Sequence, residues 1–116
     1  MTGDDFRRIT LALEGAIEKA HMGHPDFRVN GRIFATLDAR EEWGVVMLTP
    51  AEQRELMRAA KKVFVPAPGA WGRQGSTKIR LDEADEPTVR SAVLMAWERV
   101  KEMPPLRSRK PAKRGV

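Results

Sequence analysis

The sequence predicts an α+β domain, in which an antiparallel sheet carries its helices on one face. Short segments with strand-like alternation follow one another between residues 16 and 49. Segments with helical periodicity lie near both ends of the chain and in its middle. Asn30-Gly31 separates two of the strand-like runs, and this pair is a strong hairpin signal because both turn residues need positive φ. With 116 residues, the chain has room for a single domain of this class.

The first helix is expected between a cap at Thr2 and a stop at Gly15. Asp4 and Asp5 lie in its first turn, where negative charge stabilises the positive end of the helix dipole. The spacing of its apolar residues predicts one buried face, made of Phe6, Ile9, Ala12 and Leu13.

Strands are expected over the next 33 or so residues, where apolar runs alternate with turn residues. A strand from Ala16 to Met22 is expected to break at Gly23-His24-Pro25, and Trp43–Thr49 forms a later strand. Between them, Asp26–Val29 and Arg32–Leu37 form the two arms of the hairpin. Apolar residues on both faces of Val45–Leu48 predict a central position in the sheet.

The second half of the chain predicts a helix, a loop, a strand and a final helix. Thr49, Pro50 and Glu52 fit the cap and first turn of the middle helix. Its buried side is expected to consist of Leu56, Ala59, Ala60 and Val63. Phe64–Ser76 is expected to be a loop with a short strand at its start, because it holds prolines and glycines.

Alternation in Thr77–Asp82 turns Ile79 and Leu81 inward and Lys78 and Arg80 outward. The last helix is expected to start at Pro87 and to end before Pro104-Pro105. Its apolar stripe is predicted to be Val89, Ala92, Val93, Ala96, Trp97 and Val100.

The net charge of +5 is concentrated at the C-terminal end. From Lys101 onward lie 6 of the 21 basic residues and 1 of the 16 acidic ones, so the other 15 of each kind cancel. We therefore expect a domain over residues 1–103 and a basic tail without a fold of its own over residues 104–116. The absence of cysteine excludes disulfides, and no apolar stretch is long enough to span a bilayer, so we expect a cytoplasmic protein.

Two motifs resemble those of the MmcQ/YjbR family. His24–Val29 with Gly31–Leu37 forms the first, and Trp71–Thr77 forms the second. Ala96-Trp97 is similar to the last helix of that family, and the resemblance extends over residues 4–102. Met103-Pro104-Pro105 departs from the Ala-Pro-Lys of many members. The resemblance implies a frataxin-like α/β fold, also described as a double-wing DNA-binding type, and a DNA-binding function.

DNA is accordingly the expected partner, bound mainly through phosphate contacts without catalysis and without a cofactor. An aromatic and an arginine between glycines, Trp71-Gly72-Arg73, suit base stacking beside a phosphate contact. Basic side chains of the hairpin and of the last strand would extend this surface, and the tail would add salt-sensitive affinity. The expected contact residues are Arg28, Arg32, Trp71, Arg73, Lys78, Arg80, Arg107, Arg109 and Lys110.

Two other functions stay open at this point. A small-ligand or protein-binding module would use the Trp71 loop as the rim of a pocket. A metal-handling protein would use His21, His24 and Asp26, although three such residues do not complete a tetrahedral set.

Catalytic patterns find little support in the sequence. The acidic set Asp82, Glu83, Asp85 and Glu86 is expected to stabilise a helix N-terminus rather than to bind iron. Glu14 with Glu18, and Glu41 with Glu42, have no nucleophile beside them, and neither Ser76 nor Ser91 stands in a nucleophile-elbow motif. We therefore expect a protein that is not an enzyme.

Overall fold

The computed structural model describes residues 1–105, and within this range no helix is long and apolar enough to cross a membrane. The helices are α1 (Gly3–Leu11), α2 (Pro50–Ala59), α3 (Gly69–Arg73) and α4 (Glu86–Lys101), and a 3₁₀ turn covers Leu81–Glu83. The strands are β1 (Ile17–His21), β2 (His24–Val29), β3 (Arg32–Leu37), β4 (Trp43–Met47), β5 (Phe64–Pro66) and β6 (Ser76–Arg80).

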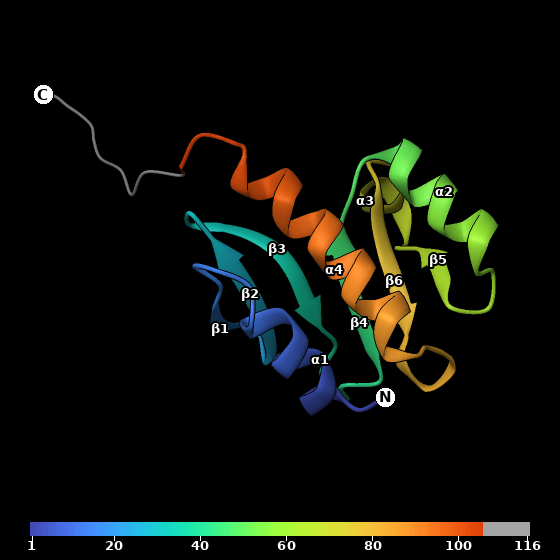
Figure 1. The fold of residues 1–116 in the computed structure, drawn as a ribbon, viewed down its shortest axis with the longest axis horizontal. Coiled ribbons are helices and arrows are strands. Elements are labelled where there is room, and N and C mark those ends of the chain that lie inside the picture. Colours follow the sequence, from blue (N-terminus) through green and yellow to red (C-terminus); the bar gives the residue numbers. More distant parts are fainter. Residues whose placement is uncertain (106–116) are drawn as a thin grey trace, which may run out of the picture.

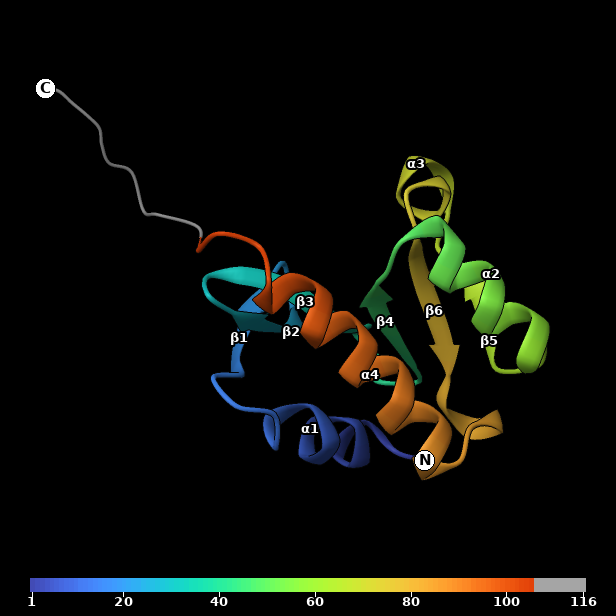
Figure 2. The same cartoon turned by 45° about the horizontal axis from the view of Figure 1, so that its top comes forward.

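The six strands form one sheet in the order β1-β2-β3-β4-β6-β5, and every neighbouring pair is antiparallel. Helix α4 crosses the middle of the sheet, with α1 beside it and α2 over β5 and β6 (Figure 1). Turning the molecule shows that these helices lie on the same side of the strands (Figure 2). The predicted α+β class, with a single antiparallel sheet and helices on one face, is thus confirmed.

The hairpins show one confirmed turn and one that the sequence did not predict. Asn30 and Gly31 join β2 to β3 with φ of 55° and 78°, as expected for this pair. Met22 and Gly23 also adopt positive φ, so β1 and β2 form a second hairpin and β2 starts at His24 instead of Asp26. Pro25 fits there because its part of β2 pairs only with β1, and the ladder with β3 begins at Asp26.

The connection between β4 and β6 departs from the prediction in two places. Helix α2 has the expected capping box of Thr49 and Glu52, but Ala59 is exposed and the buried side chain of this helix is Gln53. The predicted loop contains the short strand β5, as expected, and also the helix α3. Gln53 compensates for its burial by donating hydrogen bonds to backbone carbonyls, and a residue-type pattern does not reveal such long-range partners.

The core lies between the sheet and the pair α1 and α4. The predicted stripe of α4 is buried except for Trp97, which is half-buried and donates from Nε1 to the carbonyl of Glu14 at 2.9 Å. Phe6 of α1 meets Phe27 of β2 edge to face, with ring centroids 5.8 Å apart. Phe6 also fills the space over Gly44 in β4, where a Cβ would lie 2.6 Å from its ring. Gly44 therefore permits α1 to pack closely on the sheet.

Arg7 connects α1 to strand β1 and to the turn between β3 and β4. Its guanidinium makes ion pairs with Asp4 at 2.9 Å, Glu18 at 3.1 Å and Glu41 at 2.7 Å. Helix α1 itself ends at Leu11, earlier than the expected stop at Gly15. The hydrogen bond from Arg7 holds the pKa of Glu41 below its ordinary value.

The contact between Phe6 and Gly44 yields a first prediction. Gly44→Ala should lower the free energy of unfolding by about 1–3 kcal/mol, because the new methyl group overpacks against the Phe6 ring. In a Phe6→Leu background, the same substitution should cost clearly less. Urea unfolding of the four proteins gives the coupling energy, and strictly additive effects would show that the ring is not the obstacle.

The Arg7 cluster yields a second prediction, on acid stability. A carboxylate with a lowered folded-state pKa contributes stability above its unfolded pKa and loses it as the pH falls. Glu41→Gln should therefore reduce stability at pH 7 and flatten the loss of stability below about pH 4.5. Glu55→Gln, an exposed residue of α2 without an ion pair among the described residues, is the control and should leave the profile unchanged.

Candidate nucleic-acid interface

One face of the sheet carries no large helix, and its side chains form regular rows across the strands. In the central row, each residue is the Cα partner of the next: Lys19, Asp26, Thr36, Val45, Lys78 and Val65. The neighbouring row, Phe27, Ala35, Val46 and Thr77, is fully buried against the helices. Because side chains alternate along a strand, the central row belongs to the opposite face, which we call the open face.

Two cations of the open face are stacked on a tryptophan. The Lys78 ammonium lies 4.2 Å from the centroid of the Trp43 ring, and the Arg80 guanidinium lies 4.7 Å from it. Among residues 1–105, neither cation has a carboxylate within ion-pair distance. The indole orients both groups without forming an ion pair with them. Glu41, Glu42 and Asp82 line a cavity beside Trp43 and Arg80, so carboxylates lie near this end of the pair. The predicted outward orientation of Lys78 and Arg80 is confirmed.

Arg28 also belongs to the open face, but its charge is already matched. Its Nε and Nη2 donate to the two carboxylate oxygens of Asp26 at 2.8 and 3.1 Å. Asp26 is only 1% exposed, and its hydrogen bonds raise the pKa of Arg28 above its ordinary value. A buried carboxylate needs such a partner, so holding Asp26 is the clearest role of this arginine.

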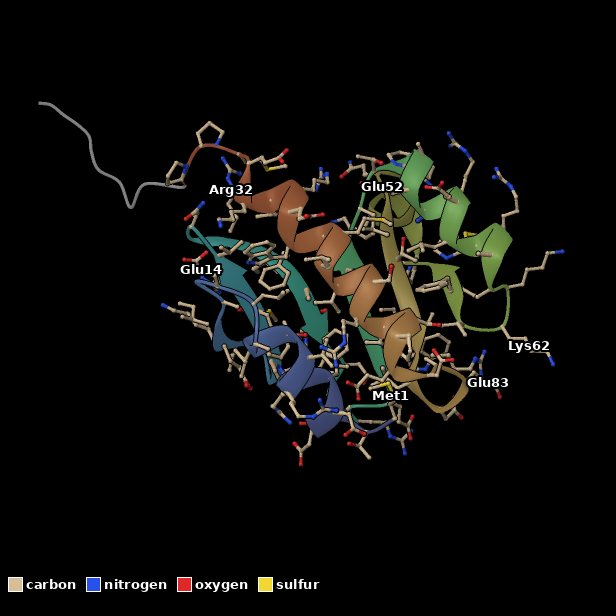
Figure 3. All side chains as sticks on the ribbon, in the orientation of Figure 1. Met1, Glu14, Arg32, Glu52, Lys62 and Glu83 are labelled. Carbon is tan, nitrogen blue, oxygen red and sulfur yellow. The ribbon has the colours of Figure 1, made fainter. Side chains whose placement is uncertain are left out.

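Arg32 does not join Lys78 and Arg80. It lies at the Asn30-Gly31 end of the hairpin, beside the C-terminal end of α4 (Figure 3), where its Nε donates to the carbonyl of Pro104 at 3.0 Å. The structure thus separates Arg32 from Lys78 and Arg80 of the open face.

The Trp71 loop is held by contacts that leave little room for larger residues. A Cβ on Gly72 would overlap the carbonyl oxygen of Ala67, and one on Gly75, at φ of 115°, would overlap that of Leu48. Buried Gln53 of α2 donates from Nε2 to the carbonyls of Gly72 and Ser76, each at 3.0 Å. These contacts fix α3 while Trp71 keeps 68% of its surface exposed.

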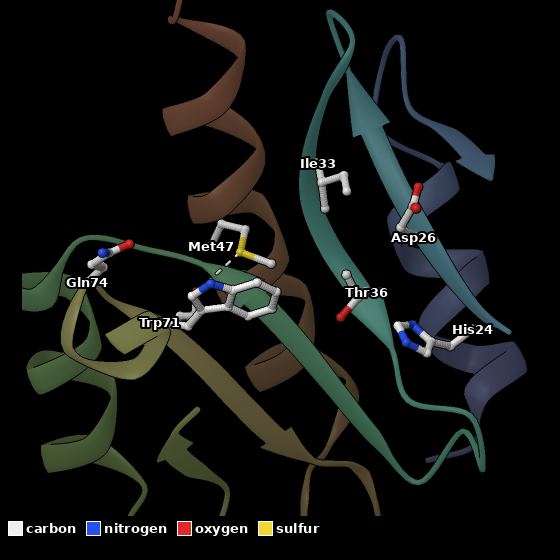
Figure 4. A pocket seen from close by; sticks show the side chains of 8 residues that line it. His24, Asp26, Ile33, Thr36, Met47, Trp71 and Gln74 are labelled. Carbon is white, nitrogen blue, oxygen red and sulfur yellow. Dashed lines mark hydrogen bonds between the residues drawn. The ribbon is translucent and has the colours of Figure 1, made fainter. Parts of the chain in front are cut away.

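Trp71 lines a cavity of about 340 Å³ on the open face. In Figure 4 the indole and Met47 stand on one side of it, and Ile33, Thr36, Asp26 and His24 stand on the other. Gln74 and Ser76 complete the lining, and the Ser76 hydroxyl donates to the Met47 sulfur at 3.4 Å. The cavity combines an aromatic plane, apolar walls and a few polar groups, which suits a flat heterocyclic ligand.

Several residues of this face were not predicted as site residues from the sequence. Trp43, Thr36 and Met47 look like ordinary strand residues, and only the register of the sheet brings them beside Lys78 or Trp71. Gln53 is a polar residue in a helix of otherwise ordinary pattern. Strand alternation could have predicted the position of Trp43. Gly44 and Val46 face inward, so Trp43 and Val45 must face outward.

The remaining candidate residues have other positions. Arg73 lies exposed in α3 near Trp71. Arg107, Arg109 and Lys110 lie outside the described residues, as does the side chain of His21. Within the described part of the chain, no group of three or more histidine, aspartate or glutamate side chains could hold a metal ion.

The acidic residues act in helix capping and ion pairing. Asp85 caps α4 by accepting from the Thr88 amide at 3.0 Å, and this interaction with Thr88 lowers the pKa of Asp85. Glu86 pairs with Arg8 and Arg90, which lowers the pKa of Glu86. For Asp85 and Glu86 these contacts agree with the predicted role at the start of a helix, whereas Asp82 and Glu83 lie in the preceding 3₁₀ turn.

Comparisons with known proteins give the family from the sequence and the fold from a solved structure. The model of the YjbR family matches residues 11–99. The crystal structure of Deinococcus radiodurans protein DR2400, with a domain of the DUF419 family model, superposes with a TM-score of 0.74 at 18% identity and covers 87% of this chain and 79% of that one. At this identity the likeness shows the fold. No curated protein matches the sequence. Because the family match spans most of the chain, this protein belongs to the YjbR family.

Proposed function

We propose that the protein is a non-enzymatic DNA-binding protein and that the DNA backbone lies across the open face. The observation that carries this proposal is the pair Lys78 and Arg80, stacked on Trp43 without a carboxylate partner among the described residues. Lysine and arginine side chains that have no carboxylate partner can contact DNA phosphates directly, and each contact releases condensed counterions from the DNA. The chain belongs to the YjbR family. The resemblance of its motifs to that family implies DNA binding, which is consistent with this function.

The proposal gives different roles to the basic residues. Lys78 and Arg80 contact phosphates, and Arg73 extends the same surface beside the exposed Trp71. Arg28 contributes less, because Asp26 already accepts two of its hydrogen bonds. The basic tail adds sequence-independent attraction.

A second candidate function is the binding of a small flat ligand in the cavity under Trp71. The observation that favours it is the position of Trp71 as one wall of a cavity of about 340 Å³, within the usual range for small-molecule sites. Its signature would be an affinity that salt hardly changes and that Trp71→Leu abolishes. Quenching of tryptophan fluorescence by adenosine, compared between the two proteins, measures it directly.

The DNA proposal predicts the effect of removing the two stacked cations. Lys78→Met with Arg80→Met should weaken binding to labelled duplex DNA and lower the slope of log affinity against log salt by about two. Fluorescence anisotropy across a salt series measures both quantities. The matched control is Arg54→Met with Arg58→Met, which removes the same charge from exposed positions on α2. An equal effect of the two pairs would show that only net charge matters and would remove the open face as the binding surface.

The contribution of the tail can be separated in the same assay. Helix α4 ends at Lys101, so a chain that ends at Met103 keeps every helix and strand of the described fold. Its salt slope should be smaller than that of the full chain, and it should still bind at moderate salt. Complete loss of binding would assign the affinity to the tail and leave the folded domain without a DNA site.

A further inference from the structure

Three arginines line a second cavity, at the end of the sheet away from Lys78 and Arg80. It has a volume of about 460 Å³ and lies between the β2–β3 hairpin and the C-terminal end of α4. The hairpin contributes Arg28 and Arg32, and α4 contributes Arg99. The rest of the lining consists of Gly31, Ile33, Val100 and Met103. No carboxylate is among these residues, and only Arg28 has one as a partner in residues 1–105.

The divergence of two central strands explains why Arg99 is there. The ladder between β3 and β4 ends at the pair Ala35 and Val46. The next residue of β4, Met47, pairs with Ser76 of β6 but has no partner in β3. Arg99 reaches the Met47 carbonyl from α4 and donates to it from Nη1 at 3.4 Å. This hydrogen bond holds the Arg99 guanidinium where β3 and β4 are no longer paired, in the cavity that Arg28 and Arg32 also line.

The three guanidiniums are anchored and still have free donors. Arg28 uses Nε and Nη2 on Asp26, whereas Arg32 and Arg99 each use a single nitrogen on a backbone carbonyl. The other nitrogens have no hydrogen-bond partner within the described part of the chain. A concave site with several unused guanidinium donors and an excess of positive charge fits a compact oxyanion with two negative charges.

The neighbouring cavity indicates what such an anion would be attached to. Ile33 lines both this arginine cavity and the cavity under Trp71, and the pair Asp26 and Arg28 contributes one residue to each. A ligand with a phosphoryl group among the arginines could place a flat base against Trp71 and Met47. We propose that the arginine cavity binds the terminal phosphoryl group of a nucleotide, either free or at the end of a nucleic-acid strand.

This site is independent of the proposed DNA contact by Lys78 and Arg80. A phosphodiester within a strand carries one negative charge and can follow the open face, whereas a terminal phosphate approaches two charges and ends the chain of contacts. The cavity is therefore expected to distinguish a phosphate monoester from the same molecule without it.

The test uses calorimetric titration of the full-length protein with adenosine 5′-monophosphate and with adenosine, at constant ionic strength. The nucleotide should bind clearly more tightly than the nucleoside. Arg32→Met and Arg99→Met should each weaken nucleotide binding about tenfold or more, because a hydrogen bond to a charged group is lost. Arg54→Met, at an exposed position of α2, is the control and should leave the affinity unchanged.

A conservative variant keeps the test decisive if one of these proteins unfolds. Arg99→Lys retains the charge but loses the planar fork, so it should fold as the original does and bind the nucleotide several-fold more weakly. Equal affinities of nucleotide and nucleoside, or unchanged affinity in both the Arg99→Lys and Arg32→Met proteins, would overturn the proposal.

A second titration identifies the source of the phosphoryl group. A short single-stranded oligonucleotide with a 5′-phosphate is compared with the same oligonucleotide lacking it, in the original protein and in Arg99→Met. A preference for the phosphorylated strand that Arg99→Met removes supports recognition of strand ends. Strong binding of the mononucleotide without such a preference supports a free nucleotide as the ligand.

Discussion

The packing of α1 and α4 against one face of the sheet is the constraint on which the other features depend. Phe6 and the buried stripe of α4 use up the apolar side of β2, β3 and β4, and the absence of a side chain at Gly44 permits their close approach. The three longer helices, α1, α2 and α4, all lie on that side of the sheet, so none of them covers the other face. The open face is therefore free to carry cations, two exposed or half-buried tryptophans and a cavity.

Much of the fold follows from the sequence because local signals and packing agree. The capping boxes of α1 and α2, the Asn30-Gly31 turn and the alternation of β6 each specify one conformation. The Met22-Gly23 turn was missed because methionine rarely adopts positive φ, and α3 because it is a single short turn rich in glycine. The Met22-Gly23 turn is exposed, and the pairing of β1 with β2 sets its conformation. In α3, by contrast, the hydrogen bonds from Gln53 hold the backbone.

The site could be predicted only in part, since its residues meet through register. Alternation shows that Lys78 and Arg80 point outward, but their stacking on Trp43 depends on which strand lies beside β6. The same limit holds for the arginine cavity. Residues 28 and 32 adjoin one turn, whereas Arg99 comes from a helix far along the chain and reaches them because β3 and β4 separate.

The hydrogen bonds of Gln53 have a consequence for the thermodynamics of ligand binding at the Trp71 loop. A glycine-bearing loop usually loses conformational entropy when a ligand orders it, and that loss weakens affinity. Here the amide of Gln53 holds the backbone at Gly72 and Ser76 before any ligand arrives. The backbone of the loop is preorganised, so an aromatic ligand that stacks on Trp71 would lose less affinity to the ordering of this segment.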